Sequence, residues 1–134
     1  MQTVRTPAVA GLFYPANAGE LHAQVRQLLN QVEPSTEPPP KAIIAPHAGY
    51  IYSGPIAASA YARLRAIRDV ITRVVLLGPS HRVGFRGIAV SGMAAFSTPL
   101  GRIPVDQEAI EQVRQLPEVG FLEQAHAQEH SLEV

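Results

Sequence analysis

Two histidines stand where the sequence predicts that a buried strand leaves the core. His47 follows the apolar run Ala42–Ala45 by two residues, in "APHAGY", and His81 follows Val74–Leu77 by four, in "LLGPSH". Ligands of open parallel sheets bind outside the carboxyl ends of the strands. Neighbouring strands lie about 4.8 Å apart, and metal–nitrogen bonds measure about 2.0–2.1 Å. Imidazoles at adjacent strand ends can therefore bind one metal ion, which is the chemistry that this spacing indicates.

The alternative for each histidine is a structural role. A single histidine after a strand is more typical of a hydrogen-bonding group than of a metal ligand. Two histidines at matching ends of one βαβ unit instead favour a shared pocket. The residues alone leave both interpretations open.

Four further residues near this pair are candidates for ligand binding or catalysis. Ser53 and Gly54 open a predicted helix, whose free N–H groups and dipole favour an anionic ligand or cofactor group. Tyr52 offers a hydroxyl for catalysis, and Arg82 offers a guanidinium to a carboxylate or phosphate. The alternatives are a packing role for Tyr52 and a solvated surface position for Arg82.

The second part of the chain supplies two more candidate catalytic residues. "QEHSLEV" places His130 three residues before Glu133, on one face if the segment is helical, and we expect His130 near the same pocket. Glu129 precedes them in the same run. Asp106 is first of all the predicted N-cap of a helix, with a catalytic role as the second interpretation.

The elements that must position these residues alternate between helices and short apolar strands. Asn17 caps the first predicted helix, which carries apolar residues at helical spacing as far as Val32. The proline-rich stretch 33–40 ends this helix. Ser53 then caps a second helix, with Pro55 in its first turn. The apolar runs on either side of this second helix form a βαβ unit, whose right-handed crossover makes the two strands parallel.

Later segments extend the same architecture. A third strand is predicted at Gly87–Ser91, a hairpin around Pro99–Gly101, and a further helix after Asp106. Apolar strands without polar alternation are typical of a sheet that is covered on both faces. The predicted fold class is therefore α/β, with a three-layer, mostly parallel sheet flanked by helices.

The composition is that of one ordinary globular domain. Of the 134 residues 46% are hydrophobic, and 11 basic residues balance 11 acidic ones. This balance gives no electrostatic footprint for nucleic acid or an anionic membrane, and no apolar run reaches the roughly 18 residues of a membrane helix. The sequence has no cysteine, which excludes a thiolate ligand from these residues. We expect a cytoplasmic protein that binds neither nucleic acid nor membrane.

Taken in order, the motifs resemble those of the Memo family, also called AmmeMemoRadiSam system protein B. The resemblance covers essentially the whole chain, and "PHAGYIYSG" together with "GPSH" is its most specific part. The matching motifs are "GLFYP" (Gly11–Pro15), "APHAGYIYSG" (Ala45–Gly54), "LLGPSH" (Leu76–His81), "STPLG" (Ser97–Gly101) and "EHSLEV" (Glu129–Val134).

The resemblance implies a fold and a site. Memo-like proteins resemble the class III extradiol dioxygenases, which use non-haem iron(II) to open catechol rings. The family pattern implies metal ligands at His47 and His81, a third ligand from a cysteine late in the chain, and an Asp-x-x-His motif lining the pocket. It implies iron(II) as cofactor, with copper as the alternative. Its candidate partners are radical-SAM and AMMECR1-like proteins, beside an unidentified small molecule or peptide.

The sequence departs from the family pattern, because it contains neither the late cysteine nor the Asp-x-x-His motif. The resemblance therefore implies that residues 1–134 are the N-terminal portion of a single Memo-like domain, truncated at the C-terminal end. The third ligand would then come from outside these residues.

Three functions follow as hypotheses. The first is a mononuclear metal site with dioxygenase-like chemistry and an unassigned reaction. The second is a metal-independent module that binds phosphorylated or carboxylate-bearing peptides through Ser53, Gly54 and Arg82. The third is a polypeptide without activity of its own that forms half of a larger fold, which heavy exposure of apolar surface would indicate.

Overall fold

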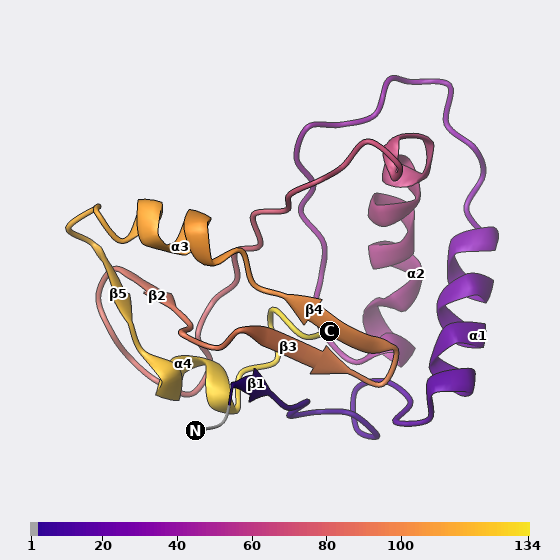
Figure 1. Cartoon of the computed structure of the whole chain (residues 1–134). Coiled ribbons are helices and arrows are strands. Elements are labelled where there is room, and N and C mark those ends of the chain that lie inside the picture. Colours follow the sequence, from indigo (N-terminus) through magenta and orange to yellow (C-terminus); the bar gives the residue numbers. More distant parts are fainter. Residues whose placement is uncertain (1–2) are drawn as a thin grey trace.

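A computed structural model describes residues 3–134 and shows an α/β architecture (Figure 1). No helix within these residues has the length and apolar character needed to cross a membrane. The helices are α1 (Ala18–Asn30), α2 (Tyr50–Tyr61), the 3-10 helix η1 (Ala62–Ile67), α3 (Gln107–Val113) and α4 (Glu123–Ala127). The strands are β1 (Val4–Arg5), β2 (Ile88–Val90), β3 (Ala95–Thr98), β4 (Gly101–Pro104) and β5 (Val119–Phe121).

Helix α1 begins as predicted. Asn17 is its N-cap, and Oδ1 of this residue accepts a hydrogen bond from the N–H of Glu20 at 3.1 Å. This bond satisfies one of the free donors of the first turn. Leu21 is the buried residue of the helix and packs with Val9 and Tyr14. Figure 1 shows α1 beside α2, on one side of the sheets.

Helix α2 begins earlier than predicted, so the assignment of Ser53 as its N-cap is wrong. Gly49 is the N-cap, and the N–H of Tyr50 donates to the C=O of Phe13 at 2.8 Å. Ser53 lies inside the helix, where its hydroxyl donates to the C=O of Ala48 at 2.7 Å. The helix starts early because a distant segment accepts the hydrogen bond of its first N–H group, which no local pattern reveals.

The two sheets contain the predicted hairpin and the predicted third strand. β3 and β4 are antiparallel and turn at Gly101, whose φ of 139° favours glycine. β1 joins β3 in parallel, with Val4 opposite Ala95. In the second sheet β2 pairs in parallel with β5, with Ile88 opposite Val119.

Two strand predictions are wrong, because neither Ala42–Ala45 nor Val74–Leu77 forms a strand in the part of the chain that the structure describes. No backbone hydrogen bond joins either segment to another backbone group of residues 3–134. A strand exists only when a neighbour takes up its N–H and C=O groups. The predicted parallel pair is therefore not formed among these residues, while the α/β class is confirmed.

The apolar core is small. Val9, Tyr14 and Leu21 form its buried cluster, and no large side chain within residues 3–134 is completely buried. By contrast, the polar residues Arg5 and Glu129 are each only 6% exposed. The most buried part of residues 3–134 thus combines a small apolar cluster with buried polar side chains.

Candidate metal centre

Three histidines from distant parts of the sequence lie together. His47 comes from the loop before α2, His81 from the loop after Val74–Leu77, and His130 from the turn after α4. The ring centroids are 5.2 Å apart for His47 and His81, 5.6 Å for His47 and His130, and 4.4 Å for His81 and His130. Each residue offers a ring nitrogen, and these nitrogens lie within 4.8 Å of one another. The structure thus brings the two histidines of the predicted pair together and adds a third.

Glu129 joins the two segments that carry His81 and His130. One carboxylate oxygen lies 2.8 Å from Nδ1 of His81 and accepts the N–H groups of His130 and Ser131, each at 2.9 Å. The other oxygen accepts the N–H of His81 at 2.6 Å. The sequence placed Glu129 in a candidate segment beside His130 but gave it no separate role, because only the fold shows that this side chain faces His81.

These donors keep the carboxyl group of Glu129 negatively charged although it is buried. Burial alone raises the pKa of its carboxyl group, but the N–H and the ring of His81 and the N–H groups that follow Glu129 outweigh burial and lower the pKa to about 2. Glu129 is therefore a carboxylate at neutral pH. Because it faces Nδ1 of His81, it favours a proton on that nitrogen and leaves Nε2 free to bind a metal.

His130 is held in its neutral form. Burial is the main cause that lowers its pKa, and the charges of His81 and His47 lower the pKa further. The guanidinium of Arg82 acts in the same direction, whereas the carboxylate of Glu129 opposes it. A neutral imidazole is the form that binds a metal.

Glu133 holds the C-terminal turn against the N-terminal segment instead of joining the histidine cluster. Its carboxylate accepts hydrogen bonds from the hydroxyl of Tyr14 at 2.5 Å and from the N–H groups of Ala8 and Val9 at 2.8 and 3.0 Å. It also forms an ion pair with Arg5. Burial alone raises the pKa of Glu133, but these four partners outweigh burial and lower the pKa. Burial and the Glu133 carboxylate together raise the pKa of Tyr14.

Arg5 completes this anchor. Its Nε donates to the C=O of His126 at 3.1 Å, and a terminal nitrogen donates to the C=O of Glu129. The side chains of Arg5 and Glu133 are only 6% and 2% exposed. The segment that carries His130 is therefore fixed to β1 by a buried ion pair.

Asp106 and Tyr52, which were predicted to be catalytic, are not members of the histidine cluster. Asp106 is the N-cap of α3, where Oδ1 accepts the N–H of Ala109 at 2.9 Å and Oδ2 pairs with Arg73 at 2.6 Å. The N–H of Ala109 and the Arg73 guanidinium lower the pKa of Asp106. Tyr52 lies in α2 and is 81% exposed. The capping prediction is confirmed, and Tyr52 is a surface residue of its helix.

Of the three residues predicted to bind an anion, only Arg82 is accessible. Ser53 and Gly54 are buried within α2, and a Cβ atom at Gly54 would come within 3.0 Å of Leu28 on α1. Gly54 therefore permits the close approach of the two helices. Pro55 lies in the helix interior and not in the predicted first turn. Arg82 is exposed and lies near enough to the histidine cluster to affect a pKa there.

His126 is a buried histidine that no sequence motif singled out. Its Nε2 lies 3.2 Å from the C=O of Ala89 in β2. Its ring also meets the ring of Phe96 edge-on, with centroids 6.0 Å apart. These contacts give His126 a structural role, and its place in "EQAHAQ" offers no spacing that would have predicted it.

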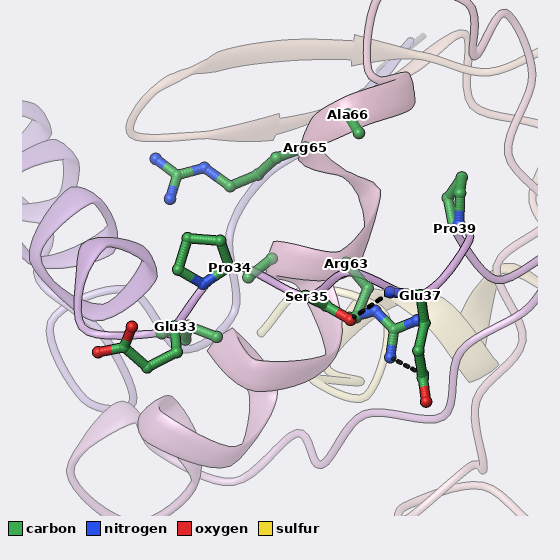
Figure 2. Close-up of a pocket in the computed structure, with 10 residues that line it drawn as sticks. Glu33, Pro34, Ser35, Glu37, Pro39, Arg63, Arg65 and Ala66 are labelled. Carbon is green, nitrogen blue, oxygen red and sulfur yellow. Dashed lines mark hydrogen bonds and ion pairs between the residues drawn. The ribbon is translucent and has the colours of Figure 1, made fainter.

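A cavity of about 190 Å³ lies away from the histidines, between the proline-rich connector and η1. Figure 2 shows Arg63 turned toward Glu37, with which it forms an ion pair at 3.1 Å, while Arg65 points the other way. Arg65 donates to the C=O of Leu29, at the end of α1, at 3.2 Å. Both guanidinium groups thus have protein partners, and no histidine of the cluster lines this cavity.

Comparison with known proteins finds relatives over nearly the full length of the chain. The family model for Memo-like proteins matches residues 5–134. A MEMO1 family protein of Aquifex aeolicus is 44% identical, over 98% of this chain and 47% of its own length. MEMO1 family proteins of Methanocaldococcus jannaschii and Thermotoga maritima are 40% and 39% identical, over 100% and 97% of this chain and 50% of their own lengths. The chain spans about half the length of the curated relatives it matches.

Proposed function

This chain belongs to the Memo-like protein family, and we propose that its three clustered histidines form a mononuclear metal site. Iron(II) is the proposed metal, with copper as the second choice, and the proposed chemistry is dioxygenase-like and acts on a small molecule. The dioxygenase-like sheet is likewise proposed for the complete family protein. The observation that carries the proposal is the convergence of three ring nitrogens within 4.8 Å of one another.

The spacing of the nitrogens fits one ion after a small adjustment. Two nitrogens bonded to the same metal lie at most about 4.2 Å apart, because each bond is about 2.1 Å long. The limit of 4.8 Å observed here exceeds this distance only slightly. A small rotation of the side chains would close this difference. Imidazole suits iron, copper and zinc alike, so the donor set supports a transition metal without selecting one.

The protein's own contribution is to orient the ligands and leave the site open. Glu129 fixes the tautomer of His81, and burial keeps His130 neutral. Three protein ligands leave coordination positions free, which is the arrangement of catalytic rather than structural sites. When bound, iron(II) would supply the capacity to activate oxygen toward a small aromatic substrate.

The test is an anaerobic titration with iron(II), repeated with copper. We expect one equivalent of metal per chain by calorimetry, with unchanged binding in His22→Ala, which removes an exposed histidine of α1. Oxygen consumption by the loaded protein is then measured with a panel of catechols. Binding without oxygen consumption would retain the metal site and remove the ring-opening reaction. No binding of either metal would refute the proposal.

The metal-independent peptide module has less support from the geometry. It needs Ser53 and Gly54 at an open helix start, and both are buried. A chelator separates the two functions. Binding of a phosphorylated peptide that survives EDTA and weakens in Arg82→Ala would favour the module over the metal site.

Replacing Glu129 by glutamine is expected to weaken metal binding by about 10–100-fold, the range found for outer partners of ligating histidines. An amide cannot accept the four donors that the carboxylate accepts, so the segments of His81 and His130 lose their common acceptor. Affinity is measured by competition with a chromophoric chelator, together with the free energy of unfolding.

The matched control for this variant is Glu123→Gln. Glu123 also accepts hydrogen bonds, from the Ser91 hydroxyl at 2.9 Å and from the N–H of Gly92, but it belongs to another part of the fold. We expect its metal affinity to equal that of the unaltered protein. An equally unaltered affinity in folded Glu129→Gln would contradict the orienting role.

A further inference from the structure

The loop that ends in His81 lies directly against the turn that carries His130. Oγ of Ser131, the residue after His130, donates a hydrogen bond to the C=O of Pro79, two residues before His81, at 2.8 Å. The Glu129 carboxylate also accepts the N–H groups of both His81 and Ser131. The two segments are therefore joined at two places, through Glu129 and through the Ser131 hydroxyl.

Gly78 has no room for a side chain at this contact. A Cβ atom there would come within 2.7 Å of Oγ and 3.0 Å of Cβ of Ser131, and within 2.8 Å of Cδ2 of Leu132. The end of the Leu132 side chain can swing away, but the Ser131 hydroxyl is held by its hydrogen bond to Pro79. Because nonbonded carbon atoms are best placed about 3.5–4.0 Å apart, a methyl group at position 78 would displace Ser131 by about 0.5 Å.

Such a displacement acts on rings that have little distance to spare. The rings of His81 and His130 are stacked, with centroids 4.4 Å apart and an angle of 22° between their planes. The ring nitrogens of the cluster lie within 4.8 Å of one another, and two nitrogens on one ion lie at most about 4.2 Å apart. An added separation of about 0.5 Å would roughly double the adjustment that metal binding requires.

We propose that Gly78 and Ser131 are positioning residues that set the distance between the rings of His81 and His130. Gly78 lets the two segments approach, and the Ser131 hydroxyl ties them together at that distance. Each residue acts through a histidine and not by contact with the metal. Their effect on affinity rests on the proposed metal site, whereas the spacing of the two rings belongs to the metal-free protein.

Gly78→Ala is expected to weaken copper(II) binding by at least about tenfold, the lower end of the range for residues that orient ligating histidines. Affinity is measured by chelator competition, and the electron paramagnetic resonance spectrum of the bound copper should change because the ligand nitrogens are displaced. The matched control is Gly84→Ala in the same loop. Gly84 is exposed, and a Cβ atom there meets nothing within 4 Å, so both the affinity and the spectrum should equal those of the unaltered protein.

Ser131→Gly tests the contact itself. Alone, it removes the hydrogen bond to the C=O of Pro79 and should weaken copper binding. In the Gly78→Ala background it removes the two atoms that the new methyl group would strike, so the double variant should bind copper more tightly than Gly78→Ala. Opposite effects of one substitution in two backgrounds are a coupling that only interacting residues show. A double variant that binds no more tightly than Gly78→Ala would overturn the proposal.

Nuclear Overhauser contacts between the ring protons of His81 and His130 in the metal-free protein separate this role from the metal site. They should be strong in the unaltered protein and in Gly84→Ala, and weaker in Gly78→Ala. If the unaltered protein bound no copper but showed this pattern, the metal site would fail and the spacing role would stand. Equally strong ring contacts in the two glycine variants would overturn the spacing role. If circular dichroism showed Gly78→Ala to be unfolded, Ser131→Gly would decide by the same two measurements, with weaker ring contacts and weaker binding expected.

Discussion

Replacing Glu133 by glutamine is expected to lower the free energy of unfolding by about 3–5 kcal/mol, the cost of leaving one partner of a buried ion pair without its counter-charge. Arg5 stays buried in the variant, because its guanidinium also donates to the C=O groups of His126 and Glu129. The N–H groups of Ala8 and Val9 would meet an amide that carries two donors of its own. The loss is measured by urea denaturation.

The control for this variant is Glu111→Gln. Glu111 pairs with Arg114 at 3.1 Å on the surface of α3, with side chains 67% and 37% exposed. An exposed pair contributes only about 0–1 kcal/mol, so this variant should be nearly as stable as the unaltered protein. Similar losses in the two variants would show that the Arg5–Glu133 pair has no special weight.

The contribution of Glu133 to the free energy of unfolding is expected to decrease in acid. In the folded protein its pKa lies below the ordinary 4.5. Its contribution to stability is therefore fully present above pH 4.5 and is lost as the pH falls through the lowered folded value. The difference in unfolding free energy between the unaltered protein and Glu133→Gln should shrink in acid below this pH, and a difference that widened there would argue against the ion pair.

Replacing His81 by alanine is expected to weaken metal binding by at least about 100-fold, beyond the 10–100-fold range of an outer partner. It removes one of three ligands and leaves two, which is fewer than metal sites in proteins use. It also frees the Glu129 carboxylate from its ring partner. His47→Ala and His130→Ala should behave alike, because all three rings contribute to one cluster.

The comparison variant for these three is again His22→Ala. Affinity is measured by chelator competition, and circular dichroism confirms that each variant is folded. If His130→Ala bound as tightly as the unaltered protein, the site would contain only the two histidines of the predicted pair. The third ligand would then have to come from outside the three-histidine cluster.

Local signals predicted the elements that depend on local chemistry. The Asn17 and Asp106 caps and the hairpin turn at Gly101 each follow from one residue and its near neighbours. The two apolar stretches gave the opposite outcome. Their composition is that of strands, but a strand also needs a partner, and residues 3–134 provide none for Ala42–Ala45 or Val74–Leu77.

The candidate site also contains one part that the sequence predicted and one part that it did not. His47 and His81 were predicted to meet at the ends of two neighbouring strands, and they do meet although neither apolar run is a strand in residues 3–134. His130 was expected near them from its neighbourhood in "EHSLEV". Glu129 and Glu133 belonged to the same candidate segment, but their supporting role was not predicted, because their partners are remote in the sequence. Glu129 reaches a residue 48 positions away, and Glu133 reaches one 128 positions away. No pattern within a window of sequence relates such residues.

The most direct measurement is anomalous diffraction at the iron edge from crystals grown with iron(II) without oxygen. We predict one peak between the rings of His47, His81 and His130, about 2.0–2.2 Å from a nitrogen of each, with Nε2 as the ligand atom of His81. Rings that turn away from one another, or a peak that none of the three nitrogens approaches, would contradict the metal site.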